Sequence, residues 1–358
     1  MRLCIPRVQG RGAGLGNEMI PWAKAFIASQ ELGASLLQPA WGLNQRGYRR
    51  YFATSRFDWM LHRALGAILP TYTFTEADYR QSGELDFGAA VRVFAQRNGL
   101  AKRRTYVLFL DGMWGGYESI RGAKDFLFGM LHATRYTQAN LYDLRQRLNG
   151  EKLQVAVHVR LGDFTRAAAN TDYRGNFNVS LPLEWYVNVC RSLRAAMGMD
   201  VDFILFTDGD ETALEKFIAE FQPVTTMRQS NTDCSDLLAM AAADLLVCSV
   251  STYSMWAAFL SGKPYLWFRP NLQRAGEFFT IWGHEPQQQL PHGLTARNVA
   301  KLQEHAGIDV SRGVPVGMDG CLPDSLIHRL MDALSLKSAT TDLIRYGATK
   351  LQEAPRKR

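Results

Sequence analysis

The chain has 358 residues, of which 47% are hydrophobic and 21% are charged, and its formal net charge is +7. This composition is that of a globular protein with room for about two domains, and it excludes an intrinsically disordered chain. The positive charge suits an anionic ligand or an anionic membrane surface. It also permits nucleic acid, but the basic clusters are short and lack interleaved aromatic residues, so we expect no nucleic-acid partner.

The five cysteines are scattered and form no Cys-x-x-Cys pair, which predicts neither a disulfide framework nor a zinc site. A reducing compartment, the cytoplasm, fits them best. The amino-terminal stretch contains no apolar signal core. The most apolar stretch, 237–260, is interrupted by Asp244 and by a group of hydroxyl residues, so we expect a buried core segment. Peripheral contact with the cytoplasmic face of a membrane remains open.

In chain order, the first predicted elements are a strand at 3–8, a glycine-rich turn at 10–16 and an amphipathic helix at about 17–32. Such a turn lets the backbone approach a ligand closely and points helix N–H groups at it. The glycine spacing matches neither the dinucleotide fingerprint nor a P-loop. The alternative is a tight turn that only joins two elements.

Residues 41–105 are rich in arginine and aromatic residues with weak periodicity, which predicts loops and short helices. A strand at 106–110 and a helix at about 135–148 follow. Asn149-Gly150 forms a turn, where we place a domain boundary.

The second half alternates strands and helices. We expect strands at 153–160, 201–207, 245–249 and 264–268, and helices at 183–197, 211–221, 236–243 (with Ser235 as N-cap) and 252–260. Continuously apolar strands in this alternation predict an α/β fold whose parallel sheet is covered on both faces. The predicted division is a domain at 1–150, a second at 151–338 and a charged, fraying tail at 339–358.

The stretch 153–164, LQVAVHVRLGDF, places apolar residues at every second position of a strand. His158 and Arg160 therefore project from the opposite face, and the strand ends at Gly162 and Asp163. Ligands bind at the carboxyl ends of strands in open α/β sheets, so this edge is a predicted site. The alternative is a buried strand whose Arg160–Asp163 pair merely closes a loop.

Six short segments, in order, carry a family resemblance. They are Gly14-Leu-Gly16-Asn17-Glu18-Met19, Gly112-Met-Trp114-Gly-Gly-Tyr117, His158-Val-Arg160-Leu-Gly-Asp163, Leu181-Pro182 with Trp185-Tyr186, Phe206-Thr207-Asp208, and Asp236-Leu-Leu-Ala-Met240 with Ser251-Thr-Tyr-Ser254-Met-Trp256-Ala-Ala. Together they resemble motifs of the GDP-fucose-dependent fucosyltransferases, most closely the α-1,2-fucosyltransferases of glycosyltransferase family 11. The chain departs from the family pattern at Leu161 (an arginine in the family), Glu18 (a glutamine) and Met255 (a tryptophan).

The resemblance implies a GT-B type architecture, in which two Rossmann-like domains with parallel sheets face a cleft and the C-terminal domain binds the donor. It implies an inverting, metal-independent transfer of L-fucose from GDP-fucose to a glycan hydroxyl, in an α-1,2 linkage, during surface polysaccharide or oligosaccharide synthesis. The implied partners are the nucleotide-sugar donor and the glycan acceptor, with no cofactor and no metal. The departures at Leu161 and Glu18 leave the sugar and the linkage open.

Carried over residue by residue, the resemblance implies three kinds of site residue. The catalytic candidates are Arg160, Asn17 and Glu18; the donor-binding candidates are Gly14, Gly16, His158, Asp163, Asp208, Asp236, Ser251, Thr252 and Ser254; the acceptor-side candidates are Trp114 and Tyr117. Arg160 can bind the β-phosphate bidentately, and the helix start at 251–254 offers hydroxyl and N–H groups to the same diphosphate. We assign no general base.

Several of these residues have a purely structural alternative. Asp236 can accept hydrogen bonds from guanine, or it can simply favour the first turn of its helix. Glu18 can act as a base or as a surface helix cap. Asp163 suits orienting Arg160 better than touching substrate.

Three other functions remain in view. Asp208-Gly-Asp210 is a D-x-D sequence, which in a transferase of the other fold would hold a divalent metal, although Asp210 also suits a helix N-cap. A second alternative is a different nucleotide-sugar on the same scaffold. A third is a non-catalytic module that binds glycan or nucleic acid.

Overall fold

The computed structural model describes residues 1–7, 14–41, 44–52, 56–84, 86–112, 114, 116–167, 171–173, 179–274, 277–278 and 312–337. The start of the glycine-rich turn and the predicted tail at 339–358 lie outside the described residues. In the part that is described, none of the helices combines the length and apolar character needed to cross a bilayer.

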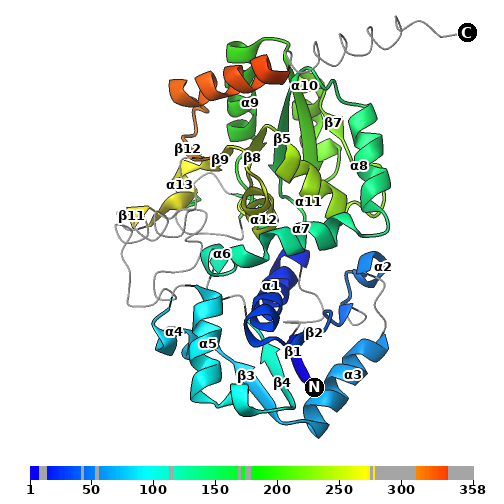
Figure 1. Ribbon diagram of the computed structural model, residues 1–358. Helices are drawn as coiled ribbons and strands as arrows, with labels where there is room; N and C mark the ends of the chain where they lie inside the picture. Colours follow the sequence, from blue (N-terminus) through cyan, green and yellow to red (C-terminus); the bar gives the residue numbers. More distant parts are fainter. Residues whose placement is uncertain are drawn as a thin grey trace, which may run out of the picture.

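The first sheet has four parallel strands in the order β2-β1-β4-β3 (Figure 1). Its strands are β1 (Arg2–Pro6), β2 (Ser35–Leu36), β3 (Thr71–Phe74) and β4 (Tyr106–Leu110). The helices of this half are α1 (Leu15–Leu32), α2 (Arg49–Phe52), α3 (Arg56–Ile68), α4 (Glu76–Ser82), α5 (Phe87–Arg97) and the 3-10 turn η2 (Leu100–Lys102). One face of the sheet packs on α1 and α5, and the other packs on the side chains of Leu65 and Leu69 at α3.

The second sheet has six strands in the order β12-β9-β8-β5-β6-β7, again all parallel. Its strands are β5 (Leu153–Val159), β6 (Val201–Thr207), β7 (Val224–Thr225), β8 (Leu245–Val247), β9 (Tyr265–Phe268) and β12 (Gly313–Val316). Its helices are α9 (Leu183–Met197), η4 (Thr212–Leu214), α10 (Glu215–Phe221), α11 (Asp233–Ala242), α12 (Thr252–Leu260) and α13 (Arg269–Leu272), with a helix at 324–337 and a small hairpin of β10 (Gln273–Arg274) and β11 (Glu277–Phe278). The structure therefore confirms an α/β protein with two parallel sheets.

The strand β5 shows why its sequence is so apolar. Val155 and Val157 point into the core beneath α9 and α10, whereas Ala156 points into the core on the side of α11 and α12. A strand covered on both faces needs apolar residues at consecutive positions.

Four segments connect the two sheets: α6 (Gly116–Ser119), η3 (Arg121–Ala123), α7 (Lys124–His132) and α8 (Thr137–Gln146). Both α7 and α8 pack against α11 of the second half, and α7 also contacts α1 and α12 (Figure 1). A domain boundary at Asn149-Gly150 stays a prediction.

The structure corrects several predicted elements. The stretch 41–105 contains the strand β3 and the helices α3 and α5, which its weak periodicity did not predict. The helix α11 begins at Asp233, so Ser235 lies inside it and donates its hydroxyl to the carbonyl of Thr232. The strands β2, β7 and β12 were also missed, because strands of two to four residues carry too few positions to show a period.

Candidate active site

A cavity of about 190 Å³ lies where the carboxyl ends of β5 and β6 face the N-termini of α1 and α12. Eight of the predicted residues line it: Gly14, Gly16, His158, Arg160, Asp208, Asp236, Ser251 and Thr252. They come from both halves of the chain, so the cavity is formed only when the two sheets are assembled.

Close contact between α1 and α12 forms one wall of this cavity. The indole Nε1 of Trp256 donates to the carbonyl of Gly16 at 2.6 Å. A Cβ on Gly16 would lie 2.9 Å from Oγ1 of Thr252 and 3.0 Å from Cδ1 of Trp256. Glycine at this position therefore lets two helix N-termini, each carrying partial positive charge, meet at one cavity.

Arg160 follows β5 directly and is held by two carboxylates. Its Nη1 lies 2.8 Å from Oδ2 of Asp208, and its Nη2 lies 2.6 Å from Oδ1 of Asp163. The Nε of Arg160 is buried and has no hydrogen-bond partner among the described residues. The two carboxylates use two of the five N–H groups of the guanidinium, so donors on its Nη atoms remain available to an anionic ligand in the cavity.

His158 is buried and neutral. Its Nδ1 lies 2.6 Å from Oγ of Ser254 and 3.1 Å from Oγ of Ser249. Burial, and to a lesser extent the neighbouring Arg160, lower the pKa of His158 to about 3, while Asp208 acts in the opposite direction. Ser254 is fully buried behind the imidazole and does not line the cavity, so its predicted contact with a diphosphate is replaced by a contact with His158.

Asp236 lies in the first turn of α11 and lines the cavity floor together with Tyr253. Burial raises the pKa of its carboxyl to about 7, although hydrogen bonds from Thr232 and Thr226 act in the opposite direction. The Oγ1 of Thr226 donates to Oδ2 of Asp236 at 3.1 Å. The carboxyl is therefore protonated in part at neutral pH and would gain a full negative charge when a ligand offers it donors.

Sequence reasoning missed eight residues that line this cavity, and Arg46, Tyr48 and Asp233 are among them. The Tyr48 hydroxyl accepts the backbone N–H of Leu15 at 2.8 Å and so helps to hold the start of α1. Asp233 accepts a short hydrogen bond from Tyr51, and both belong to contacts between the halves. The only signal in the sequence was the abundance of arginine and aromatic residues after position 41.

Six predicted site residues lie outside the cavity lining: Asp163, Ser254, Asn17, Glu18, Trp114 and Tyr117. Glu18 is buried inside α1, so it is not a surface cap, and Asn17 is half-buried with its Oδ1 unpartnered among the described residues. Trp114 packs against Phe74, Tyr79 and Phe87, and the Nζ of Lys24 lies 3.2 Å from the centre of its ring. Tyr117 is buried against Trp256 and donates to the carbonyl of Thr252 at 3.3 Å. Neither ring has a face open for stacking on a sugar.

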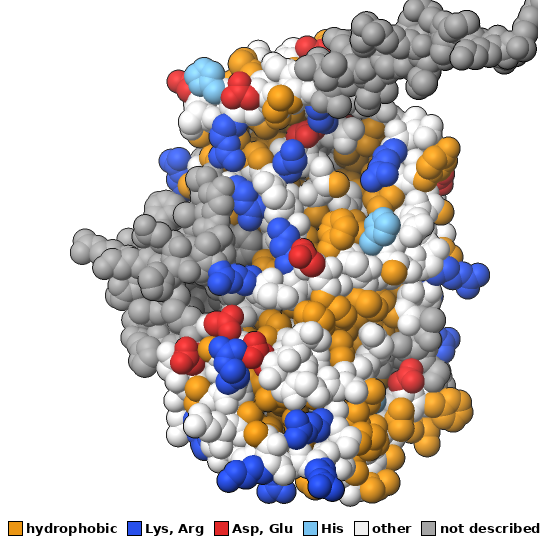
Figure 2. Space-filling view, in the orientation of Figure 1, with side chains coloured by type: hydrophobic (Ala, Val, Ile, Leu, Met, Phe, Trp, Pro, Cys, Tyr) orange, Lys and Arg blue, Asp and Glu red, His pale blue; other side chains and the backbone are white. Residues whose placement is uncertain are grey.

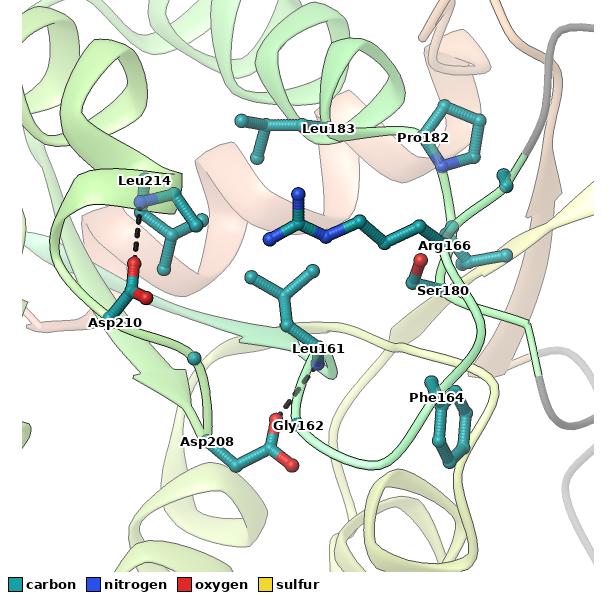
Figure 3. A pocket seen from close by; sticks show the side chains of 14 residues that line it. Leu161, Gly162, Phe164, Arg166, Ser180, Pro182, Leu183, Asp208, Asp210 and Leu214 are labelled. Carbon is teal, nitrogen blue, oxygen red and sulfur yellow. Dashed lines mark hydrogen bonds between the residues drawn. The ribbon is translucent and has the colours of Figure 1, made fainter.

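A second pocket, of about 680 Å³, opens on the other side of the loop after β5 (Figure 3). The side chain of Leu161 points into this pocket, and Arg166 reaches across it (Figure 3). Leu161 does not line the first cavity, and its backbone N–H donates to Oδ1 of Asp208 at 2.8 Å. The departure from the family pattern at position 161 therefore changes the second pocket and not the cavity that contains Arg160.

Both carboxylates of the Asp208-Gly-Asp210 sequence already have partners. Asp208 pairs with Arg160, and Oδ1 of Asp210 accepts the backbone N–H of Ala213 at 2.7 Å. The N-cap of the turn η4 is Glu211, so the N-cap prediction for Asp210 is wrong by one residue. Within the described ranges, no group of three or more histidine, cysteine, aspartate or glutamate side chains is placed to hold a metal ion.

Comparison with known proteins shows the family to which the chain belongs. The family model of glycosyl transferase family 11 matches residues 99–285, which is more than half of the chain. No curated protein sequence matches the chain significantly.

Solved fucosyltransferases show a weak structural likeness. NodZ from Bradyrhizobium is 13% identical with a TM-score of 0.43, covering 73% of this chain and 93% of its own. The α-1,6-fucosyltransferase NodZ soaked with GDP-fucose is 15% identical with a TM-score of 0.41, covering 73% and 92%. POFUT1 in complex with GDP-fucose is 11% identical with a TM-score of 0.45, covering 74% and 97%. Since these scores are low, the assignment depends on the family model: this chain belongs to glycosyl transferase family 11 and is a glycosyltransferase.

Proposed function

We propose that the enzyme transfers L-fucose from GDP-fucose to a hydroxyl of a glycan acceptor, in an inverting and metal-independent reaction. We propose an α-1,2 linkage, formed during the synthesis of a surface polysaccharide or oligosaccharide. The observation that carries the proposal is the convergence of the Arg160 guanidinium and the N-termini of α1 and α12 on one cavity.

The diphosphate is the group that this arrangement suits best. When the bond between the sugar and GDP breaks, negative charge grows on the β-phosphate and positive charge grows on the sugar. Arg160 can neutralise the phosphate by charge-assisted hydrogen bonds, each contributing about 1.5–3 kcal/mol. The first turn of α12, with Ser251 as its N-cap and Thr252 beside it, adds donors that need no reorganisation.

We assign the nucleotide base to Asp236, which lines the same cavity. Its carboxylate can accept from the N1–H and the 2-amino group of guanine together, whereas uracil offers only one such donor. His158 also lines the cavity and is neutral, so it can contact ribose or phosphate without adding a second positive charge.

We assign no residue as the general base that would deprotonate the acceptor. The acceptor hydroxyl must lose its proton during an inverting displacement, but neither Asn17 nor Glu18 lines the cavity. A strongly cationic transition state lowers the demand for such a base.

Two observations weigh against the alternatives. Asp208 and Asp210 are both engaged by protein donors, which favours a structural role over metal coordination for the D-x-D sequence. Leu161 lies outside the cavity, which supports an unchanged donor class in spite of the departure at this position.

The described cysteines are all free, which supports our proposal of a reducing compartment, the cytoplasm.

Calorimetric titration with GDP, UDP and NAD tests the donor. We expect tight binding of GDP and weak binding of UDP and NAD. Equal affinity for UDP would contradict the guanine assignment.

Release of GDP from GDP-fucose, measured with and without EDTA, tests the reaction. We expect the activity to survive EDTA. A loss of activity in EDTA that added divalent metal restores would establish the metal-dependent alternative.

A further inference from the structure

The outward face of α3 is apolar, which is the reverse of an ordinary surface helix. Phe57, Met60, Leu61, Ala64 and Ile68 are spaced three or four positions apart and so share one side of the helix. Four of them are large and strongly exposed: Phe57 at 75%, Met60 at 57%, Leu61 at 50% and Ile68 at 78%. Figure 2 shows hydrophobic side chains gathered at the lower right, where α3 lies in Figure 1.

The opposite side of α3 attaches the helix to the first sheet. His62 is buried, Leu65 packs against the small core of Leu3, Ile5, Val107 and Phe109, and Gly66 lies against the Phe109 ring. The orientation of the helix is therefore set by its buried side. The exposed apolar face is a consequence of the native packing.

Two arginines lie near this face. Arg63 lies on α3 itself, with its guanidinium 5.4 Å from the Trp59 ring. Arg7 lies 4.1 Å from the Phe109 ring, which Gly66 of α3 also approaches. Both arginines are exposed.

Acidic groups are scarce in the same part of the chain. Between residues 41 and 75 the sequence has five arginines and one acidic residue, Asp58. An apolar face bordered by arginine and tryptophan has the composition of helices that lie in the interface of an anionic membrane.

A second copy of the chain is a poorer occupant for this face. The helix has 13 residues, so its outward side is roughly 20 Å long and 10 Å wide. That is roughly 200 Å², well below the ~800 Å² that each partner of a stable dimer usually buries. A lipid surface has no such minimum, because each apolar side chain that enters it adds independently.

We propose that the outward face of α3 docks the enzyme on a membrane surface that contains anionic phospholipid, with Met60, Leu61 and Ile68 entering the acyl boundary and Arg63 contacting headgroups. The helix lies in the interface plane and does not cross the bilayer. It lies at the end of the first half that is farthest from the second sheet, so the cavity between the halves stays clear of the contact (Figure 1). This inference does not depend on the identity of the donor.

Co-sedimentation of the full chain with vesicles tests the proposal. We expect binding to vesicles of phosphatidylcholine and phosphatidylglycerol in equal amounts, and much weaker binding to phosphatidylcholine alone. The triple variant Met60→Ser, Leu61→Ser, Ile68→Ser should lose roughly 10- to 100-fold in affinity for the anionic vesicles. Arg63→Gln should lower the affinity roughly fivefold at low salt and little at high salt.

The matched control is the double variant Tyr142→Ser, Met199→Ser, which removes side chains of similar exposure (63% and 67%) from elsewhere on the surface. It should bind vesicles as the wild type does. Retained binding by the triple variant, or no binding by the wild type, would overturn the proposal. So would a dimer in sedimentation velocity that the triple variant dissociates, since this would assign the face to a second copy. Release of GDP from GDP-fucose in solution should be unchanged in the triple variant, which separates docking from catalysis.

Discussion

The Oγ of Ser254 lies 2.6 Å from Nδ1 of His158, although the two residues are 96 positions apart in the chain. The same oxygen accepts the backbone N–H of Ser249 at 3.0 Å. When its own proton points to Nδ1, the neutral imidazole carries its proton on Nε2. We predict this arrangement, in which the α12 serine selects the form of His158 that can donate a hydrogen bond to a ligand in the cavity.

Replacing Ser254 with alanine should weaken the binding of GDP about tenfold, because the imidazole would no longer be restricted to one tautomer. Calorimetry measures the affinity, and the nitrogen chemical shifts of His158 report its tautomer. Ser249→Ala is the matched control, since it keeps the closer partner of Nδ1 and should change the affinity less. Unaltered nitrogen shifts in Ser254→Ala would refute the tautomer argument even if affinity fell.

Arg160→Ala should lower the turnover number by about 10²–10³-fold with little change in melting temperature. The melting temperature should change little because the carboxylates that Arg160 leaves behind are at least partly exposed to solvent. Arg160→Lys should recover only part of the activity, since an ammonium group cannot bind a phosphate bidentately. Arg166→Ala removes a guanidinium from the neighbouring pocket and serves as the control. If turnover in Arg160→Ala equals that of the wild type, the role in diphosphate binding is wrong.

The affinity for GDP should fall as the pH drops below about 7. The carboxyl of Asp236 has a pKa of about 7, and once protonated it cannot accept both guanine donors. In the limit, the affinity should fall about tenfold for each pH unit below that pKa and level off above it. His158 stays neutral over this range, since its pKa is about 3. Asp236→Asn should bind GDP weakly and without this pH dependence. A group with this pKa titrates between about pH 5 and pH 8. A wild-type affinity for GDP that is constant over that range would contradict the assignment of Asp236 to the guanine base.

Asp236 should also leave a mark on folding stability that does not involve a ligand. Burial raises its pKa in the folded chain above the ordinary value of 3.8, so the folded state binds this proton more tightly than the unfolded state. The stability of the wild type should therefore decrease relative to Asp236→Asn as the pH rises from 3.8 towards 7, and the difference should stay constant above that. Melting curves of the two proteins over this range measure the difference. A constant difference would mean that the carboxyl has an ordinary pKa.

Gly16→Ala should destabilise the protein by about 1–3 kcal/mol, because the added methyl group would press on Thr252 and Trp256. The displaced helices would also weaken GDP binding. Gly14→Ala is the control for stability: a Cβ there meets nothing within 4 Å, and we expect a loss below about 1 kcal/mol. Equal melting temperatures for the two variants would show that α1 and α12 can move apart without a loss in the free energy of unfolding.

The sequence alone was sufficient for four of the six strands of the second sheet, β5, β6, β8 and β9, and for the residues that follow β5 and β6. The unbroken apolar run of β5 and the helix and strand patterns after it predicted β6, α9 and α12 with their observed bounds. These elements are long or regular enough for their period to be visible, and parallel strands bring their carboxyl ends together whatever the details of packing.

Only the tertiary structure decided which of these side chains face the cavity. Ser254 and Thr252 lie two positions apart on α12, yet one is buried behind His158 and the other lines the cavity. Trp114 and Tyr117 have the composition of a sugar-stacking pair but are enclosed by other aromatic rings. The apolar side chains of α3 share one side of the helix, and only the packing of the first sheet shows that this side faces outward. The periodicity of apolar residues in a sequence shows that a helix has an apolar and a polar face. Which face meets solvent depends on contacts between segments far apart in the chain.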